Sequence, residues 1–386
     1  MKRYNIWLSL LAVLLLVACS KDSEQTVTPG PAPVDNGSKP DPVPTPGAPD
    51  CPLSLVAATR GADSGYFDAA NEYGSYDPIQ FFLMSGANEA SVNQKREGLF
   101  TYDLDRKVWS STIGLKDASN CIYGFSPASA ASCAISPAQG TSYNGGAVLK
   151  MTNLNAASGS DLCVIVGVKH GTTATAAQGI PEIGQYYFGM KSENYVSLLL
   201  DHVFARIDFK IKLGQEYAKM RYIKVKKLEL QSSYDLTGVT VRLIPGADAE
   251  VSYTTAAVGA NGTPSTGTIY DFSADTDEKN SEGKDITLEG TVFPGFFAPD
   301  DASQIAQGLS LVCTYDVYAV DAFNDNKIGT RVRENCVAVN SLAGMEALAK
   351  MKRGKKTSLS LTVEPTYLYQ LSDDELNNPT IKVKSE

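Results

Sequence analysis

The chain has 386 residues, with 34 Lys or Arg and 43 Asp or Glu, so its formal net charge at pH 7 is −9. This acidic balance argues against nucleic-acid binding, which depends on Lys and Arg contacts to phosphates. The length is enough for about two domains.

The first residues are typical of a signal peptide. Lys2 and Arg3 precede an apolar run from Ile6 to Ala18 that stops at Cys19. A positive start followed by a short apolar run marks a secretory leader, and the run is shorter than the ~20 residues of a membrane-spanning helix. We expect residues 1–18 to be removed on export. Because no acidic residue leaves with Lys2 and Arg3, the mature net charge would be −11.

The end of the leader, Leu16-Val17-Ala18-Cys19, resembles the lipobox of bacterial lipoproteins. The resemblance implies that Cys19 becomes the acylated, palmitate-bearing N-terminus of a protein anchored in the outer membrane. Each buried methylene of such an anchor contributes ~0.8 kcal/mol. The polar cluster Ser20–Glu24 resembles the tags that send some lipoproteins to the outer face of that membrane. The alternative is an ordinary secretory signal followed by a cysteine of no special role.

Residues 19–50 are predicted to be a tether. From Thr26 to Pro49 the chain consists of prolines, glycines and small polar residues, with almost nothing apolar to bury. Such a composition gives a semi-rigid spacer. At ~3.1 Å per residue it could hold the folded part some tens of ångströms from the bilayer.

The remaining chain has the pattern of short β-strands. Ile207, Phe209 and Ile211 alternate with Asp208 and Lys210, as in a strand with one buried face. Further strands are predicted at 53–57, 79–84, 99–102, 121–125, 162–168, 223–230, 309–320, 328–339 and 359–363. The 309–320 and 328–339 segments flank Asn324-Asp-Asn326 and predict a hairpin. One helix is predicted, from Ser341 as N-cap to Gly354 as the stop.

These elements predict an all-β fold of two β-sandwich domains in tandem, with few short helices. We place the boundary near residue 195, before the segment Tyr195–Lys212, which gives domains of residues 51–195 and 196–386.

Six cysteines remain after the anchor: Cys51, Cys121, Cys133, Cys163, Cys313 and Cys336. An even number in an exported chain permits disulfides, but there is no CxxC pair and no dense spacing. Cys163 lies in the apolar run Leu162–Val166, where we expect a free buried thiol. The disulfide state of the others stays open.

The sequence does not predict an enzyme, a cofactor or a metal site. It holds two histidines, His170 and His202, and no HExxH, GxSxG, Walker or GxGxxG motif. Asp201 and His202 are adjacent on a predicted strand, so their side chains should point to opposite faces. We therefore expect His202 to be a structural, hydrogen-bonded residue. Acidic pairs such as Asp300-Asp301 and Asp373-Asp374 are interpreted as isolated surface carboxylates.

Three sequence segments resemble those of the fimbrillin superfamily, which comprises the subunits of type V pili and their Mfa-like relatives in anaerobic Gram-negative bacteria. The first is Phe100-Thr-Tyr102, then Trp109, then Tyr123-Gly-Phe125-Ser-Pro127. The second is Leu198-Leu-Leu-Asp-His-Val-Phe-Ala-Arg-Ile207, and the third is Gly354-Lys-Lys-Thr-Ser-Leu-Ser-Leu-Thr-Val-Glu-Pro365. The third departs from the family pattern, because the tyrosine usual in that strand is absent.

The resemblance implies two transthyretin-like β-sandwiches in a fimbrial subunit or surface adhesin. Its partners would be other pilus subunits and host or bacterial surface ligands. In that family a protease cuts after a basic residue beyond the first strand, the strand leaves, and an extended segment of another subunit replaces it. Here Arg60 matches the cleavage position, and the departing strand would carry Leu53, Leu55 and Val56. The alternative is an ordinary edge strand followed by a turn.

A second interpretation is a surface glycan-binding lipoprotein, which would share the leader, the tether and the sandwiches. Sugar-binding faces favour exposed aromatic side chains. The mature chain keeps one tryptophan, Trp109, and Tyr186-Tyr187 is the other aromatic candidate. The sequence leaves open whether the protein is a stalk, tip or anchor subunit.

Overall fold

The computed structural model describes a set of ranges separated by gaps. They are residues 51–60, 77–115, 119–154, 162–189, 192–204, 206–213, 217, 220–257, 265–271, 286–288, 308–321, 327–346, 353–354, 356–364, 376–377 and 379–385. The leader, Cys19 and the tether therefore lie outside the described residues, as does the stretch that follows Arg60. Within these ranges no helix is long and apolar enough to cross a membrane.

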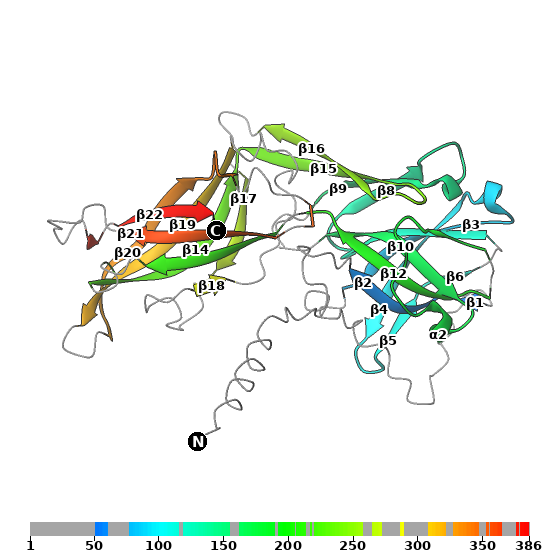
Figure 1. The fold of residues 1–386 in the computed structure, drawn as a ribbon, viewed down its shortest axis with the longest axis horizontal. Helices are drawn as coiled ribbons and strands as arrows, with labels where there is room; N and C mark the ends of the chain where they lie inside the picture. Colours follow the sequence, from blue (N-terminus) through cyan, green and yellow to red (C-terminus); the bar gives the residue numbers. More distant parts are fainter. Residues whose placement is uncertain are drawn as a thin grey trace, which may run out of the picture.

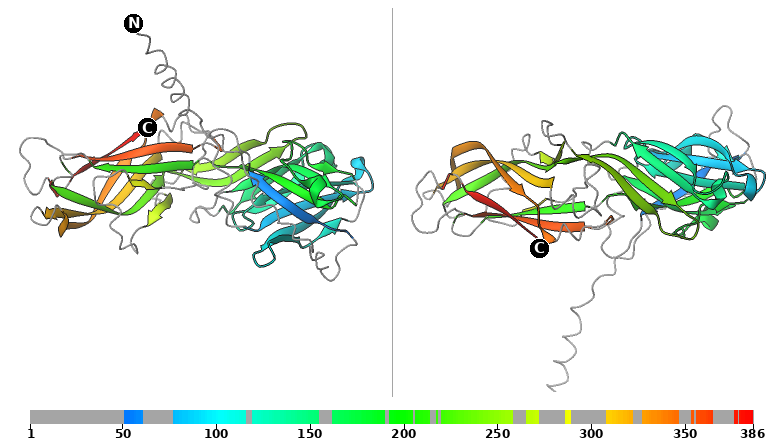
Figure 2. Two further views of the ribbon diagram at one scale, coloured as in Figure 1. Left: turned by 60° about the horizontal axis from the view of Figure 1, so that its bottom comes forward. Right: turned by 90° about the horizontal axis from the view of Figure 1, so that it is seen from above.

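The fold is all-β, as the sequence predicts, and consists of two β-sandwiches arranged end to end (Figures 1 and 2). The helical elements of the described residues are short: η1 (Glu89–Ser91), η2 (Tyr143–Gly145) and α2 (Ala174–Ala177). The helix predicted from Ser341 does not begin there, so this prediction is wrong at its start. Ser341 is the last residue of β20 (Lys327–Ser341), and the chain then turns, with Gly344 at φ +77°. Residues 347–352 of the predicted helix lie outside the described ranges.

The first sandwich pairs a large sheet with a smaller one. The large sheet has the order β2 (Ser54–Arg60), β12 (Tyr195–His202), β10 (Cys163–Gly171), β7 (Ser119–Ser126), β3 (Ile79–Gly86), β4 (Gln94–Asp103), β5 (Val108–Ser111), and β11 (Tyr187–Phe188) pairs with β7. The smaller sheet has the order β16 (Glu250–Ala257), β15 (Tyr234–Leu243), β9 (Ala147–Thr152), β8 (Ser132–Pro137). A two-stranded sheet joins β1 (Cys51–Pro52) to β6 (Gly114–Leu115).

The second sandwich is built from two four-stranded sheets. One has the order β18 (Ile286–Leu288), β13 (Arg206–Leu213), β21 (Lys356–Glu364), β22 (Thr380–Ser385). The other has the order β17 (Ser265–Asp271), β14 (Arg221–Ser232), β19 (Leu309–Asp321), β20 (Lys327–Ser341). The predicted hairpin of residues 309–339 is confirmed as the antiparallel pair β19–β20. The side chains of Ile207, Phe209 and Ile211 lie outside the described set, although β13 itself is formed.

Both faces of the large sheet are apolar, because successive residues of its strands alternate between two cores. The core between the two sheets, called here the inter-sheet core, includes Phe82, Met84, Tyr123, Leu149, Met151, Val164 and Leu199. On the other face the edge strands β2 and β5 come together, and the sheet curls around a second core. This inner core includes Leu53, Leu55, Phe81, Phe100, Ile122, Ile165 and Leu198.

The hairpin β15–β16 ties the two halves of the chain together. Only Ser233 separates β14, a strand of the second sandwich, from β15, which pairs antiparallel with β9 of the first. The hairpin contributes Leu236, Val239, Val241 and Leu243 to the inter-sheet core. The chain thus passes directly from β14 of one sandwich into β15 of the other, in the green part of the ribbon in Figure 1.

The tip of this hairpin is fixed by a close backbone contact. The Gly246 N–H donates to the Gly184 carbonyl at 3.0 Å, and Gly184 has φ +79°. A Cβ at Gly184 would approach the Gly246 nitrogen to 2.4 Å, so this position requires glycine.

The predicted domain boundary near residue 195 is corrected by this topology. β12, which we expected to open the second domain, lies within the large sheet of the first sandwich, between β2 and β10. Its residues Val196, Leu198 and Leu200 complete the inner core, which explains why it stays there. The chain enters the second sandwich after Phe204 and returns to the first with residues 234–257. The two sandwiches therefore do not correspond to two continuous segments.

Candidate functional site

The first strand of the folded part is held along most of its length. β2 pairs in parallel with β12, with Leu55 opposite Val196 and Arg60 opposite Leu200. Just before it, β1 pairs antiparallel with β6, with Cys51 opposite Leu115. The chain from residue 51 to residue 60 therefore lies along the seam where the two edges of the curled sheet meet.

The structure buries the three apolar residues that were predicted to leave with the first strand, one directly before β2 and two within it. Leu53, Leu55 and Val56 are 2%, 4% and 6% exposed, and the two leucines belong to the inner core. A register shift between β2 and β12 at Val56 explains how two consecutive apolar residues are both buried. Burial of such side chains stabilises by roughly 1.5–3 kcal/mol each. Loss of the strand would therefore expose a substantial apolar surface.

Arg60 is the last residue of β2. Its backbone pairs with Leu200, and residues 61–76 lie outside the described ranges. The predicted cleavage bond, between Arg60 and Gly61, thus lies where the described pairing of the first strand ends.

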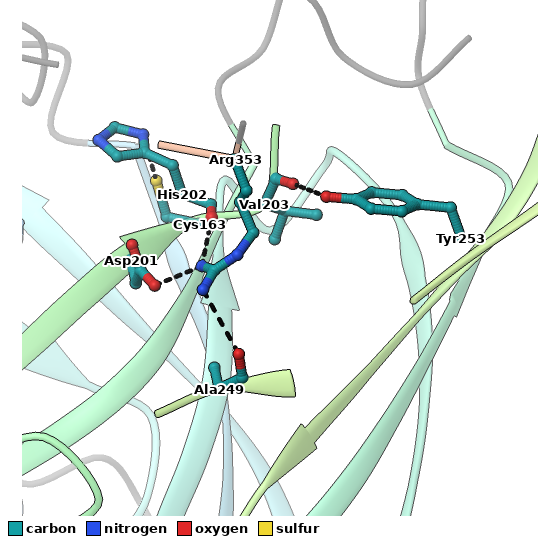
Figure 3. Close-up of polar contacts among 7 residues, drawn as sticks. All are labelled: Cys163, Asp201, His202, Val203, Ala249, Tyr253 and Arg353. Carbon is teal, nitrogen blue, oxygen red and sulfur yellow. Dashed lines mark hydrogen bonds and ion pairs between the residues drawn. The ribbon is translucent and has the colours of Figure 1, made fainter. Parts of the chain in front are cut away.

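Beside this point lies a junction between the sandwiches, shown in Figure 3. The Arg353 guanidinium forms a salt bridge with the Asp201 carboxylate and donates to the His202 carbonyl at 2.8 Å and the Ala249 carbonyl at 3.4 Å. We call this arrangement the Arg353 clasp. Nearby, the Tyr253 hydroxyl donates to the Val203 carbonyl at 2.6 Å.

The clasp joins three parts of the chain. Asp201 and His202 end β12, Ala249 precedes β16, and Arg353 precedes β21 of the second sandwich. The side chains of Arg353 and Asp201 are 17% and 15% exposed, so most of this charge pair is shielded from water. Arg353 could not be recognised from the sequence. Its neighbours Lys352 and Gly354 make it look like the basic end of the predicted helix.

His202 is a structural residue, as predicted. Cys163 and His202 are direct cross-strand partners, and the thiol Sγ lies 3.5 Å from His202 Nδ1. The Asp201 side chain binds Arg353 instead, which confirms that the two neighbours face opposite ways. A thiol beside an imidazole can act as a nucleophile pair. Here both residues are 0% exposed, so a substrate has no access to them.

The described cysteines Cys121, Cys133, Cys163, Cys313 and Cys336 are free thiols. This confirms the free, buried thiol expected at Cys163. Burial raises the pKa of Cys121, Cys133 and Cys313 to about 12, so these thiols stay protonated at neutral pH and are poor nucleophiles. Over the described ranges, no group of three or more His, Cys, Asp or Glu residues could hold a metal ion.

The aromatic candidates for a sugar-binding face are mostly occupied in packing. Tyr186 is 2% exposed and belongs to the inter-sheet core, so the predicted Tyr186-Tyr187 surface patch is wrong for its first member. Trp109 makes an edge-to-face contact with Tyr102, with ring centroids 5.3 Å apart, and packs against the inner core.

The geometry defines an all-β, two-sandwich protein whose candidate site is a buried N-terminal strand. No family model and no curated protein matches the sequence. Among solved structures the chain is similar to one described as a cell adhesion protein from Bacteroides uniformis, at 13% identity and a TM-score of 0.40, covering 87% of this chain and 98% of that one. A fimbrial protein from Bacteroides vulgatus matches at 12% identity and 0.40, with the same coverage. The fimbrial anchor protein Mfa2 from Porphyromonas gingivalis matches at 10% and 0.26, again over 87% and 98%.

Proposed function

We propose that the protein is a fimbrial subunit or surface adhesin, exported as a lipoprotein, that accepts a strand from another subunit after its own first strand is removed. The observation that carries the proposal is the position of β2. It is the first long strand of the folded part, it buries Leu55 in the inner core beside Leu53, which directly precedes it, and it ends at Arg60.

The physical basis is β-augmentation. Removing β2 would leave the outer edge of β12 without its partner from Tyr195 to Leu200 and would uncover the inner core. An open edge beside apolar side chains favours pairing with another chain. Main-chain hydrogen bonds give affinity, and alternate side chains filling the positions of Leu53 and Leu55 give register.

The C-terminal strand favours an accepting rather than a donating subunit. β22 pairs antiparallel with β21 in the second sandwich, from Thr380 opposite Glu364 to Ser385 opposite Leu359. Its Ile381 is 5% exposed. Because this short segment is already part of a sheet, donating it would cost those contacts. A tip subunit, which accepts a strand and does not donate one, agrees with this arrangement.

Limited trypsin treatment of residues 20–386 tests the exchange. We expect early cleavage after Arg60, because proteases act where the backbone opens locally and the paired part of β2 ends there. The nicked protein should then form dimers and larger species on size-exclusion chromatography, or bind an added apolar strand peptide. Mass spectrometry should show a new N-terminus at Gly61.

Arg60→Ala is the matched control, since it leaves Leu53, Leu55 and Val56 in place. It should remain monomeric under the same treatment. If the nicked protein also stays monomeric, with the peptide that contains Leu53–Val56 still bound, strand exchange is rejected for this protein.

The lipid anchor is tested by Cys19→Ala expressed in a Gram-negative host with the leader intact. The variant should fold normally but lose membrane retention, because the proposed anchor precedes both sandwiches and its acyl chains supply the membrane affinity. Detergent-phase partitioning measures this, and a variant that still enters the detergent phase contradicts the lipoprotein proposal.

A further inference from the structure

The last residues of β12 are shared by two distant parts of the chain. Arg60, at the end of β2, pairs with Leu200. The next two residues of β12, Asp201 and His202, bind Arg353, which leads into β21 of the second sandwich. The end of the first strand and the junction between the sandwiches thus lie within two residues of each other on β12.

Several main-chain contacts reinforce this junction. The Gly354 N–H donates to the Phe204 carbonyl at 3.0 Å, directly after Arg353. Arg353 also reaches the Ala249 carbonyl, at the start of β16. One guanidinium therefore holds the end of β12, the inserted hairpin and the entry to β21 together, as Figure 3 shows for its side-chain contacts.

The end of β2 is held in the sheet by its pairing with β12. Thr59 pairs with Leu199 of β12, and Arg60 pairs with Leu200. Strand ends open locally more often than strand centres, and their opening follows the stability of the neighbour that holds them. If the end of β12 is fixed, the backbone pairs of Thr59 and Arg60 with β12 should stay formed.

We propose that the Arg353 clasp couples the docking of the second sandwich to the retention of the first strand. With the clasp closed, the end of β12 is fixed and the pairs at Thr59 and Arg60 stay formed. When β21 moves away from β12, the clasp opens, the end of β2 frays, and the Arg60–Gly61 bond becomes more accessible to a protease. This inference rests on the proposed exchange of the first strand, and it adds a contact that controls when that strand is released.

The chemistry of the clasp suits such a role. The guanidinium is planar with several donors, so it can bind a carboxylate and two carbonyls on different elements at once. A lysine carries its charge on one nitrogen and cannot reproduce this set of contacts. Removing the arginine also leaves the shielded Asp201 carboxylate without its counter-charge, which is unfavourable.

Hydrogen exchange of Arg353→Gln, measured on residues 20–386, tests the proposal. We expect the amides of residues 57–60 to exchange roughly tenfold faster than in the parent, because a mostly shielded ion pair contributes more than an exposed pair and less than a fully buried one. Trypsin cleavage after Arg60 should accelerate by a similar factor, since cleavage follows the population of the open form. Arg353→Lys should fall between the parent and Arg353→Gln.

Two controls make the result specific. Arg242 lies in the β15–β16 hairpin and pairs with Glu250 at the surface. Arg242→Gln should change neither the hydrogen exchange of residues 57–60 nor the rate of cleavage after Arg60. The amides of β3 and β7, in the centre of the large sheet, serve as an internal reference. Asp201→Asn removes the same ion pair from the other side and should reproduce Arg353→Gln.

Unchanged exchange and cleavage in both Arg353→Gln and Asp201→Asn would overturn the coupling. Equal acceleration in β3 and β7 would overturn it as well, because the loss would then be global. Failure of the nicked protein to oligomerise is a separate result. It would reject strand exchange. The hydrogen-exchange rates of the amides of residues 57–60 would still show whether the clasp holds the first strand.

Discussion

Residues 51–204 expressed alone will not form a folded domain, although they contain every strand of the large sheet. The inter-sheet core is completed by Leu236, Val239, Val241 and Leu243 of the β15–β16 hairpin. At roughly 1.5–3 kcal/mol for each large apolar side chain, their loss removes about 6–12 kcal/mol. Typical domains have only about 5–15 kcal/mol of stability. We expect a fragment that binds hydrophobic dyes and unfolds without a cooperative transition.

The matched control restores the hairpin. A fusion of residues 51–204 to residues 234–257 through a Gly/Ser linker should fold and unfold cooperatively in urea. In this fusion the Tyr253 hydroxyl can again donate to the Val203 carbonyl, as it does at 2.6 Å in the full chain. A well-folded 51–204 fragment would show that the hairpin is dispensable and that the predicted boundary near residue 195 was nearly sufficient.

The strands that are short, nearly continuous apolar runs could be predicted from the sequence. Residues 79–84 lie in β3, 121–125 in β7 and 163–168 of the predicted 162–168 in β10. The β19–β20 hairpin was also predictable, since Asn324-Asp-Asn326 separates its two strands. In each case the information is local, because apolar runs and turn residues act over a few positions.

The pairing partners could not be predicted. Val239, Val241 and Leu243 alternate with polar residues, which indicates a strand with one buried face. Alternation does not say which sheet buries that face. The partner of β15 is β9, about 90 residues earlier in the chain, and β14 pairs instead with β19. The boundary near residue 195 was wrong for this reason.

The candidate site was predicted in part. The apolar residues Leu53, Leu55 and Val56 and the position of Arg60 were visible in the sequence, and the structure buries the three apolar side chains. The parallel pairing with β12 was not visible. Neither was Arg353, because its three partners Asp201, His202 and Ala249 lie more than 100 residues away and no local pattern connects them.

A large single-residue effect in the second sandwich is expected at Asp316, which stabilises a bulge in the β19–β20 hairpin. Between the pairs Tyr315–Cys336 and Val317–Arg333, two residues of β20 lie opposite this one aspartate. The Asp316 side chain is 3% exposed and accepts the Asn335 N–H at 2.8 Å. Asn335 has φ +51°, a left-handed conformation that asparagine adopts more readily than most residues other than glycine.

Two cations also surround this carboxylate. Lys226 Nζ lies 3.6 Å from Asp316 Oδ1 and Arg331 Nη1 lies 3.5 Å from Oδ2. Asp316→Ala therefore removes a charged acceptor from one backbone N–H and two basic groups. Because Lys226 and Arg331 are partly exposed and can be hydrated, we expect a loss of roughly 2–4 kcal/mol in the free energy of unfolding. Urea denaturation of the full mature chain measures it.

Glu250→Ala is the matched control for this prediction. Glu250 Oε2 lies 3.3 Å from Arg242 Nη1, a contact as close as those of Asp316, but the two side chains are 68% and 40% exposed. Exposed pairs of this kind contribute only about 0–1 kcal/mol, because water solvates both charges when the pair is broken. Asp316→Asn should lie between the two, since an amide oxygen can still accept the Asn335 N–H but carries no charge for Lys226 and Arg331. Equal losses for Asp316→Ala and Glu250→Ala would mean that the bulge does not depend on the buried carboxylate.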